Sequence, residues 1–91
     1  MIRSFRHKGL AKLWNEGDAR SIRHDLIGRV RQRLTALNAA QHLRDLHVPG
    51  WRFHPLHETP KRYAIAVNGP WRITFEWTDG DALRVDLEQY H

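Results

Sequence analysis

The chain has 91 residues, contains no cysteine, and carries 15 Lys and Arg side chains against 10 Asp and Glu, which gives a formal net charge of +5. A chain of this length folds as one domain with a small core, which excludes a second lobe closing over a deep cleft. The missing cysteines exclude disulfides, zinc–thiolate sites and thiol nucleophiles, and no apolar run is long enough to span a membrane. We therefore expect one cytoplasmic domain over residues 1–91, with no signal peptide and no membrane partner.

The charge is unevenly distributed along the chain. Residues 1–35 hold nine cationic and three acidic side chains, whereas residues 76–91 hold one cationic and five acidic side chains. Twelve of the fifteen cations are arginine, whose planar guanidinium can bind phosphate through two hydrogen bonds. This distribution favours a polyanionic or acidic partner, with nucleic acid as the first candidate, over a basic surface without a partner.

The first half of the chain has the apolar spacing of amphipathic helices. This spacing predicts one helix over residues 8–16 and a second from about residue 22 to residue 39. Gly17 ends the first helix, and Ser21 is a candidate N-cap of the second. A further helical turn is expected at residues 43–46, before a Pro-Gly pair breaks the chain.

From residue 51 onward the apolar residues recur at every second position, which is the period of a strand. The strands expected from this pattern and from a short apolar run near the N-terminus cover residues 2–5, 51–53, 63–67, 71–77 and 83–87. Asn68-Gly69 and Asp79-Gly80 mark two hairpin turns, so the last three strands form an antiparallel meander. Leu83, Val85 and Leu87 would then share one face of the sheet.

One face of the predicted sheet is apolar, so the two amphipathic helices must cover it. Trp71 and Trp77 are expected in this core. The opposite face is polar and open, and it would carry His54, Arg72, Thr74, Glu76, Arg84, Asp86 and Glu88. The predicted fold class is therefore α+β, with two N-terminal helices packed on one face of a small, mainly antiparallel twisted sheet.

The sequence contains no glycine-rich nucleotide-binding loop, zinc-protease motif or nucleophile elbow. His54 and His57 stand three apart in an extended segment, which directs them to opposite faces and disfavours a shared metal. We expect no metal and no cofactor. What remains is a cationic face beside histidines, which can cleave RNA by acid–base attack of the ribose 2′-OH on the adjacent phosphate. A site this shallow needs another body to hold the RNA in line.

Four segments of the chain, in the right order and at the right separations, resemble the HigB toxins of the RelE/ParE superfamily. They are Ile2–Leu10, His54-Pro55-Leu56, Val67–Phe75 and Tyr90-His91. The resemblance spans the whole chain and implies a RelE-like fold and a ribosome-dependent mRNA endonuclease, with the ribosome holding the message. It also implies a HigA-like helix-turn-helix antitoxin as partner. This protein would contact operator DNA only indirectly, through that antitoxin.

The resemblance implies roles for four residues. His54 matches the family's central catalytic histidine, Tyr90 and His91 match its terminal pair, and Arg72 matches an arginine that faces the scissile phosphate. His54 and His91 would divide the two proton transfers, in either order, while Arg72 stabilises the phosphorane-like transition state. Alternatively, Arg72 would form a cross-strand ion pair with an acidic residue of the last strand.

Two positions depart from the well-known HigB relatives. His57 stands where they have a lysine after His-Pro-Leu, so a permanent cation becomes a titratable one, and Gln89 stands where they have an aspartate. Lys61 or Arg62 would be the auxiliary cation that compensates. We therefore expect weaker or more pH-dependent activity than in these relatives.

The arginines of the second helix would bind ribosomal RNA or the antitoxin, unless they are only a solvated face; they are Arg23, Arg29, Arg31 and Arg33. Two other function classes compete with the nuclease. One is a ParE-like inhibitor that binds DNA gyrase without catalysis, and the other is a plain RNA-binding domain. Message fragments would indicate the nuclease, DNA damage signalling the gyrase inhibitor, and harmless overexpression the binding domain.

Overall fold

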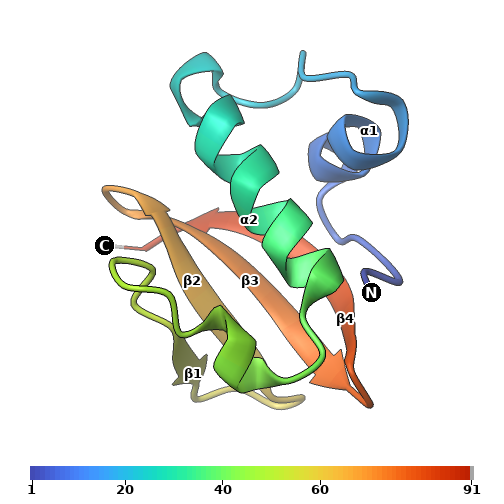
Figure 1. The fold of residues 1–91 in the computed structure, drawn as a ribbon. Helices are drawn as coiled ribbons and strands as arrows, with labels where there is room; N and C mark the ends of the chain where they lie inside the picture. The colour runs from blue at the N-terminus through green and yellow to red at the C-terminus, as the bar shows by residue number, and fades with distance from the viewer. Residues whose placement is uncertain (91) are drawn as a thin grey trace.

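The computed structural model describes residues 1–90. Its helices and strands are α1 (Lys8–Glu16), α2 (Ile27–Ala39), β1 (His54–Leu56), β2 (Arg62–Asn68), β3 (Trp71–Thr78) and β4 (Asp81–Gln89), with 3₁₀ turns at His24–Leu26 and Leu43–Leu46. The strands form one antiparallel sheet in the order β1-β2-β3-β4, and α2 crosses one face of it (Figure 1). This arrangement confirms the α+β fold class. Within the described part of the chain, no helix is both long and apolar enough to cross a membrane.

The core lies between the helices and one face of the sheet. Its largest fully buried apolar side chains come from α1, α2, the two 3₁₀ turns and the strands: Leu10, Leu26, Val30, Leu34, Leu37, Leu46, Ile65, Ile73, Phe75 and Val85. Burying each of them stabilises the fold by about 1.5–3 kcal/mol. Trp71 and Trp77 are only partly buried and pack against the edge of this core, which corrects the prediction that both lie inside it.

The helix predicted over residues 8–16 is confirmed, and Gly17 ends it with a left-handed φ of 72°. The second helix begins later than predicted. Its first residue is Ile27, because the residues just before it form a 3₁₀ turn instead of α-helix. Ser21 is therefore not the N-cap. Leu26 holds that position, and no side chain caps the helix.

The first strand of the sheet lies further along the chain than the predicted residues 51–53. β1 begins at His54 and pairs with β2, although Pro55 has no N–H to donate. An edge strand tolerates proline because one of its sides needs no hydrogen bonds. Trp51 is instead buried in the preceding loop, where its carbonyl accepts the N–H of Ala66 at 2.6 Å.

A bulge in β4 changes the predicted alternation of that strand. The register between β3 and β4 shifts near Arg84, whose backbone has a left-handed φ of 48°. Leu83, predicted on the apolar face, pairs with Glu76 of the polar face, whereas Ala82 and Val85 are buried in the core. The extra residue of a bulge shifts the two-residue period, so positions on its two sides no longer share a parity.

The N-terminal segment lies along the outer edge of β4. It makes two isolated parallel bridges, Ile2 with Ala82 and Phe5 with Val85, rather than the full strand predicted over residues 2–5. The sheet is antiparallel throughout its four strands, with these two parallel bridges at its edge.

Candidate active site

Segments that are far apart in the sequence meet at one end of the sheet. The β2–β3 hairpin, the loop before β1 and the end of β4 come together there (Figure 1). The N–H of Tyr90 donates to the carbonyl of Pro70 at 2.8 Å and so ties the end of β4 to the hairpin. The Ala66 to Trp51 hydrogen bond ties the loop to β2 in the same way. Backbone contacts thus hold the three segments in fixed positions.

The register of the sheet places His54 and Arg72 on the same face. His54 pairs with Ala64, Ala64 pairs with Thr74, and Thr74 lies two residues from Arg72 along β3. Paired residues, and residues two apart on a strand, project to one face, so both side chains belong to the polar face. At about 4.8 Å between strands and about 3.4 Å per residue, their Cα atoms lie roughly 12 Å apart. Ala64 and Thr74 are fully buried, so this face is not open here, contrary to expectation.

His54 is exposed, and one nitrogen of its ring is held by the loop before β1. Nδ1 lies 2.8 Å from the carbonyl oxygen of Arg52. Because a carbonyl only accepts hydrogen bonds, Nδ1 carries the proton, which leaves an unprotonated Nε2 on the neutral ring. The left-handed backbone of Arg52, with a φ of 52°, helps to set this carbonyl against the ring. The neutral ring is therefore in the tautomer whose Nε2 can act as a general base.

The guanidinium of Arg72 is bound by backbone carbonyls. Its Nη1 donates to Gly69 at 2.6 Å and to Trp71 at 2.9 Å, which fixes the side chain on the hairpin. Within residues 1–90 it forms no ion pair, so the predicted alternative of a cross-strand partner in β4 is not found. The three N–H groups on its Nε and Nη2 make no hydrogen bond within residues 1–90, so Arg72 is able to bind a phosphate oxygen.

Tyr90 is a neutral hydrogen-bond donor at this end of the sheet. Partial burial raises the pKa of its phenol, Glu88 and Glu58 raise it further, and Arg62 and Arg72 oppose the shift. The phenol therefore stays protonated through the neutral pH range. His91, the other residue of the predicted terminal pair, lies outside the described residues.

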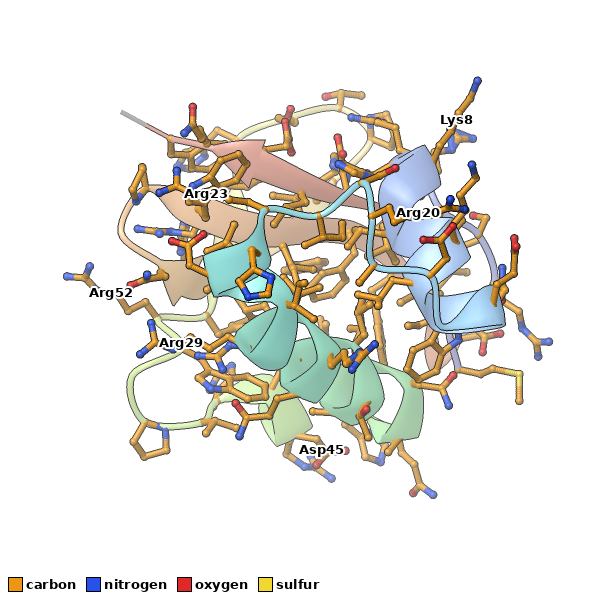
Figure 2. All side chains as sticks on the ribbon, turned by 90° about the horizontal axis from the view of Figure 1, so that it is seen from above. Lys8, Arg20, Arg23, Arg29, Asp45 and Arg52 are labelled. Atoms are coloured by element: carbon orange, nitrogen blue, oxygen red, sulfur yellow. The ribbon has the colours of Figure 1, made fainter. Side chains whose placement is uncertain are left out.

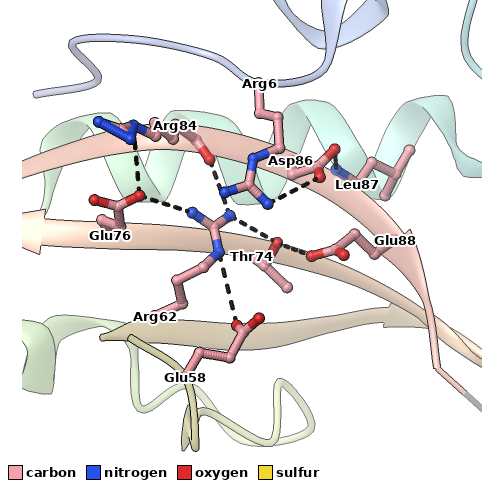
Figure 3. A network of polar contacts seen from close by, with 9 residues as sticks. All are labelled: Arg6, Glu58, Arg62, Thr74, Glu76, Arg84, Asp86, Leu87 and Glu88. Atoms are coloured by element: carbon pink, nitrogen blue, oxygen red, sulfur yellow. Dashed lines mark hydrogen bonds and ion pairs between the residues drawn. The ribbon is translucent and has the colours of Figure 1, made fainter. Parts of the chain in front are cut away.

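Arg62 is buried in a polar network on the same face, which we call the Arg62 network (Figure 3). Its side chain is only 3% exposed, and its Nη2 donates to the Thr74 hydroxyl at 3.0 Å and to the Arg84 carbonyl at 2.9 Å. Its Nη1 donates to Glu76 at 3.3 Å, and the Thr74 hydroxyl donates in turn to Glu88. Arg62 is thus committed to internal partners, and the sequence pattern had no signal for this burial.

His57 and Lys61, the other auxiliary candidates, are both exposed and lie on the loop between β1 and β2. The same loop carries Glu58, whose carboxylate lies 4.0 Å from Nε of Arg62. This Nε is the one buried side-chain polar atom without a hydrogen-bond partner among the residues that the structure describes. Of the cations near β1 and β2, Lys61 is therefore better placed than Arg62 to meet a ligand from solvent.

The same end of the molecule contains a basic hollow of about 370 Å³, which we call the arginine hollow. Arg29 and Arg33 of α2 line it together with Arg52 and Arg72. Figure 2 shows Arg29 and Arg52 on the same side of the molecule. Two of the four arginines therefore come from the helix surface that the sequence singled out, and Arg72 is shared with the candidate active site.

The remaining arginines of the predicted helix surface do not line the hollow. Arg23 pairs with Asp25 at 2.8 Å, and Arg31 is exposed. Arg52 is a site residue that sequence reasoning missed. The only local signal is the Pro-Gly pair just before it, at residues 49–50, which predicts a turn but not the direction of the side chain.

Relatives of known name match the whole chain. The sequence model of a family described as the RelE-like toxin of type II toxin-antitoxin system HigB matches residues 3–91. The chain is 36% identical over 92 residues to a protein named Endoribonuclease HigB from Proteus vulgaris, with 100% of both chains covered. It is 32% identical over 93 residues to Toxin HigB-1 from Vibrio cholerae, with 99% of this chain and 98% of the relative covered. By its sequence, the chain belongs to the RelE-like HigB toxins of type II toxin–antitoxin systems.

Proposed function

We propose that this protein is a ribosome-dependent endoribonuclease that cleaves translated messages by metal-independent acid–base chemistry. Family membership and the endoribonuclease name of the Proteus vulgaris relative support an activity on RNA. The observation that carries the chemistry is the hydrogen bond from Nδ1 of His54 to the Arg52 carbonyl, because it leaves Nε2 as a base on an exposed ring.

In the proposed reaction, Nε2 of His54 accepts the proton of a ribose 2′-OH, whose oxygen attacks the adjacent phosphorus. The bond from phosphorus to the 5′-oxygen of the next nucleotide breaks, which leaves a 2′,3′-cyclic phosphate on one product. His91 would donate the proton that the departing 5′-oxygen takes up. Arg72 would stabilise the negative charge on the phosphorane-like transition state, and the neutral Tyr90 hydroxyl would donate to the same phosphate.

The small size of the domain supports a need for the ribosome. His54 is exposed and residues 1–90 form a single sheet with helices on one face, so this domain by itself does not enclose an RNA strand. Holding the 2′-OH, phosphorus and leaving oxygen in line contributes a large part of such a rate enhancement. A message fixed on the ribosome would arrive already aligned.

A type II toxin has an antitoxin partner, and we propose that this partner is a HigA-like helix-turn-helix protein. Contact with operator DNA would then be made by the antitoxin alone. Co-expression of such an antitoxin is expected to restore growth of cells that express the toxin.

The test is induced expression of the protein and of His54→Ala in growing cells, followed by mapping of the 5′ ends of messages. The unaltered protein is expected to produce fragments cut in register with codons. Loss of the base should lower cleavage by about 10²–10⁴-fold. His24→Ala is the matched control, because His24 is also an exposed histidine and has no proposed role in the site.

Both variants should unfold at the temperature of the unaltered protein, since neither ring is buried. A folded His54→Ala protein that cleaves at the full rate would contradict the role of His54. DNA damage signalling without message fragments would favour the gyrase inhibitor, and harmless accumulation would favour a plain RNA-binding domain. Nitrogen chemical shifts of His54 measured by NMR should show the proton on Nδ1.

A further inference from the structure

The arginine hollow concentrates positive charge that the protein itself does not neutralise. Its lining combines four arginines with the backbone and small side chains of the β2–β3 hairpin and the loop before β1: Arg29, Arg33, Gly50, Arg52, Ala66, Val67, Asn68, Gly69 and Arg72. No carboxylate belongs to this described lining. Like charges repel one another, so a hollow of this composition is most stable when an anion occupies it.

Two of the four arginines are held in place by the protein. Nε of Arg33 donates to the carbonyl of Ala66 at 3.1 Å, and its guanidinium lies 4.8 Å from the centre of the Trp51 ring. Arg72 is held by the carbonyls of the hairpin. These two cations are already ordered before a ligand binds, which lowers the entropy lost on binding.

The other two arginines remain free to reach a ligand. Arg29 and Arg52 are exposed, and their side chains make no hydrogen bond or ion pair with residues 1–90. A guanidinium can bind a phosphate through two parallel hydrogen bonds. The hollow thus combines two cations held by the protein with two exposed cations, an arrangement suited to a phosphate group.

The hollow is directly connected to the candidate active site. The carbonyl of Arg52 accepts from His54, whereas its side chain lines the hollow, and Arg72 lies in both. Arg52 and Arg72 thus link the hollow to His54, so a polyanion of several phosphates could contact both. A protein partner fits less well, because its interface would need an apolar centre and the hollow is lined mainly by arginines, backbone and small side chains.

We propose that the arginine hollow binds the sugar–phosphate backbone of the RNA substrate beside the scissile phosphate, with Arg29 and Arg52 as its phosphate-binding residues. This inference rests on the proposed endoribonuclease function and adds a second contact point for the same RNA. The contact reads no bases, so it would hold any message in register with His54. Two contact points fix the position of the strand more tightly than the scissile phosphate alone would.

The test measures binding of a short, fluorescently labelled 2′-O-methyl RNA, which lacks the attacking hydroxyl and is not cleaved. The double variant Arg29→Gln/Arg52→Gln should bind at least about tenfold more weakly at low salt, because two phosphate contacts are lost. The slope of log affinity against log salt should fall by about 1.4, or about 0.7 for each contact to a single strand. Both side chains are exposed, so the variant should fold, and the Arg52 carbonyl still holds His54.

Lys12→Gln/Arg44→Gln is the matched control, since it removes the same charge from exposed positions outside the hollow. An equal loss of affinity in the control, or no loss in the hollow variant, would overturn the inference. So would normal RNA affinity combined with lost neutralisation by the antitoxin, which would assign the hollow to the protein partner. If the unaltered protein cleaves messages while the hollow variant binds normally, only this inference fails. If the unaltered protein neither binds the RNA nor cleaves messages, the proposed function fails.

Discussion

Arg62 and Arg72 project from the same face of one sheet and have opposite surroundings. Arg62 is 3% exposed and contacts Glu76 and Thr74, with Glu88 linked to it through the Thr74 hydroxyl. Among residues 1–90, the guanidinium of Arg72 donates hydrogen bonds to backbone carbonyls and not to an acid, and it shares its hollow with three other arginines. Buried charges are costly unless they are paired, whereas a cation that is left without an acid can bind an anion from outside. One arginine therefore serves folding and the other is available for recognition.

Of the changes that test this difference between the two arginines, replacement of Arg62 should have the largest effect, and the effect is on stability. Arg62→Met should lower the free energy of unfolding by roughly 3–5 kcal/mol, because it leaves the Glu76 carboxylate and neighbouring polar groups without their buried partner. Arg84→Ala is the control within the same network. Its side chain is 60% exposed and lies 3.6 Å from Glu76, so its loss should amount to about 1 kcal/mol or less. Urea unfolding followed by tryptophan fluorescence measures both values, and equal effects would contradict a buried anchoring role for Arg62.

In the arginine hollow, removal of charge should have a smaller effect of the opposite sign. Arg52→Gln should stabilise the free protein at low salt by about 0.5 kcal/mol or less, because one of four like charges is lost. The gain should vanish near 1 M salt, where screening acts over roughly 3 Å. Thermal unfolding in a salt series measures this effect. Lys12→Gln should show less salt dependence, and destabilisation by Arg52→Gln at low salt would show that the hollow is not electrostatically strained.

The smallest expected effect concerns the titration of Tyr90, whose pKa both Arg62 and Arg72 influence. Burial raises the pKa of its phenol, followed by Glu88, so Glu88→Gln should lower this pKa while burial keeps it above the ordinary value. Phenolate absorbance in a Tyr63→Phe background isolates Tyr90, since the chain has two tyrosines.

The same shift links Tyr90 to stability at alkaline pH. The folded protein holds the phenol proton more tightly than the unfolded chain does. The stabilisation that Tyr90 contributes is therefore fully present below about pH 10, and it is lost as the pH rises through the raised pKa of the folded protein. The fall should be less steep in Glu88→Gln. An unchanged titration in that variant would show that the Glu88 carboxylate does not act on the phenol.

Local sequence patterns were sufficient to identify the helix at residues 8–16, the two hairpins and the α+β class. Periods of 3.6 and 2, together with Asn-Gly and Asp-Gly turns, depend on neighbours along the chain, and those neighbours are visible in one sequence. The bulge at Arg84 is different, because it depends on how β4 meets β3. Nothing in the alternation of Leu83, Val85 and Leu87 indicates that one of them faces the other way.

The candidate site also has features that the sequence predicts and features that only tertiary contacts set. His54, Arg72 and the arginines of the second helix are recognisable as a basic, histidine-containing set from residue type and from the family pattern alone. The burial of Arg62, the tautomer of His54 and the entry of Arg52 into the hollow depend on contacts between β2, β3, β4 and the loop before β1. Sequence determined which charges this protein carries. Only the tertiary structure decided which of them are neutralised inside and which remain for a ligand, because the surroundings of a charge are built from segments distant in the chain.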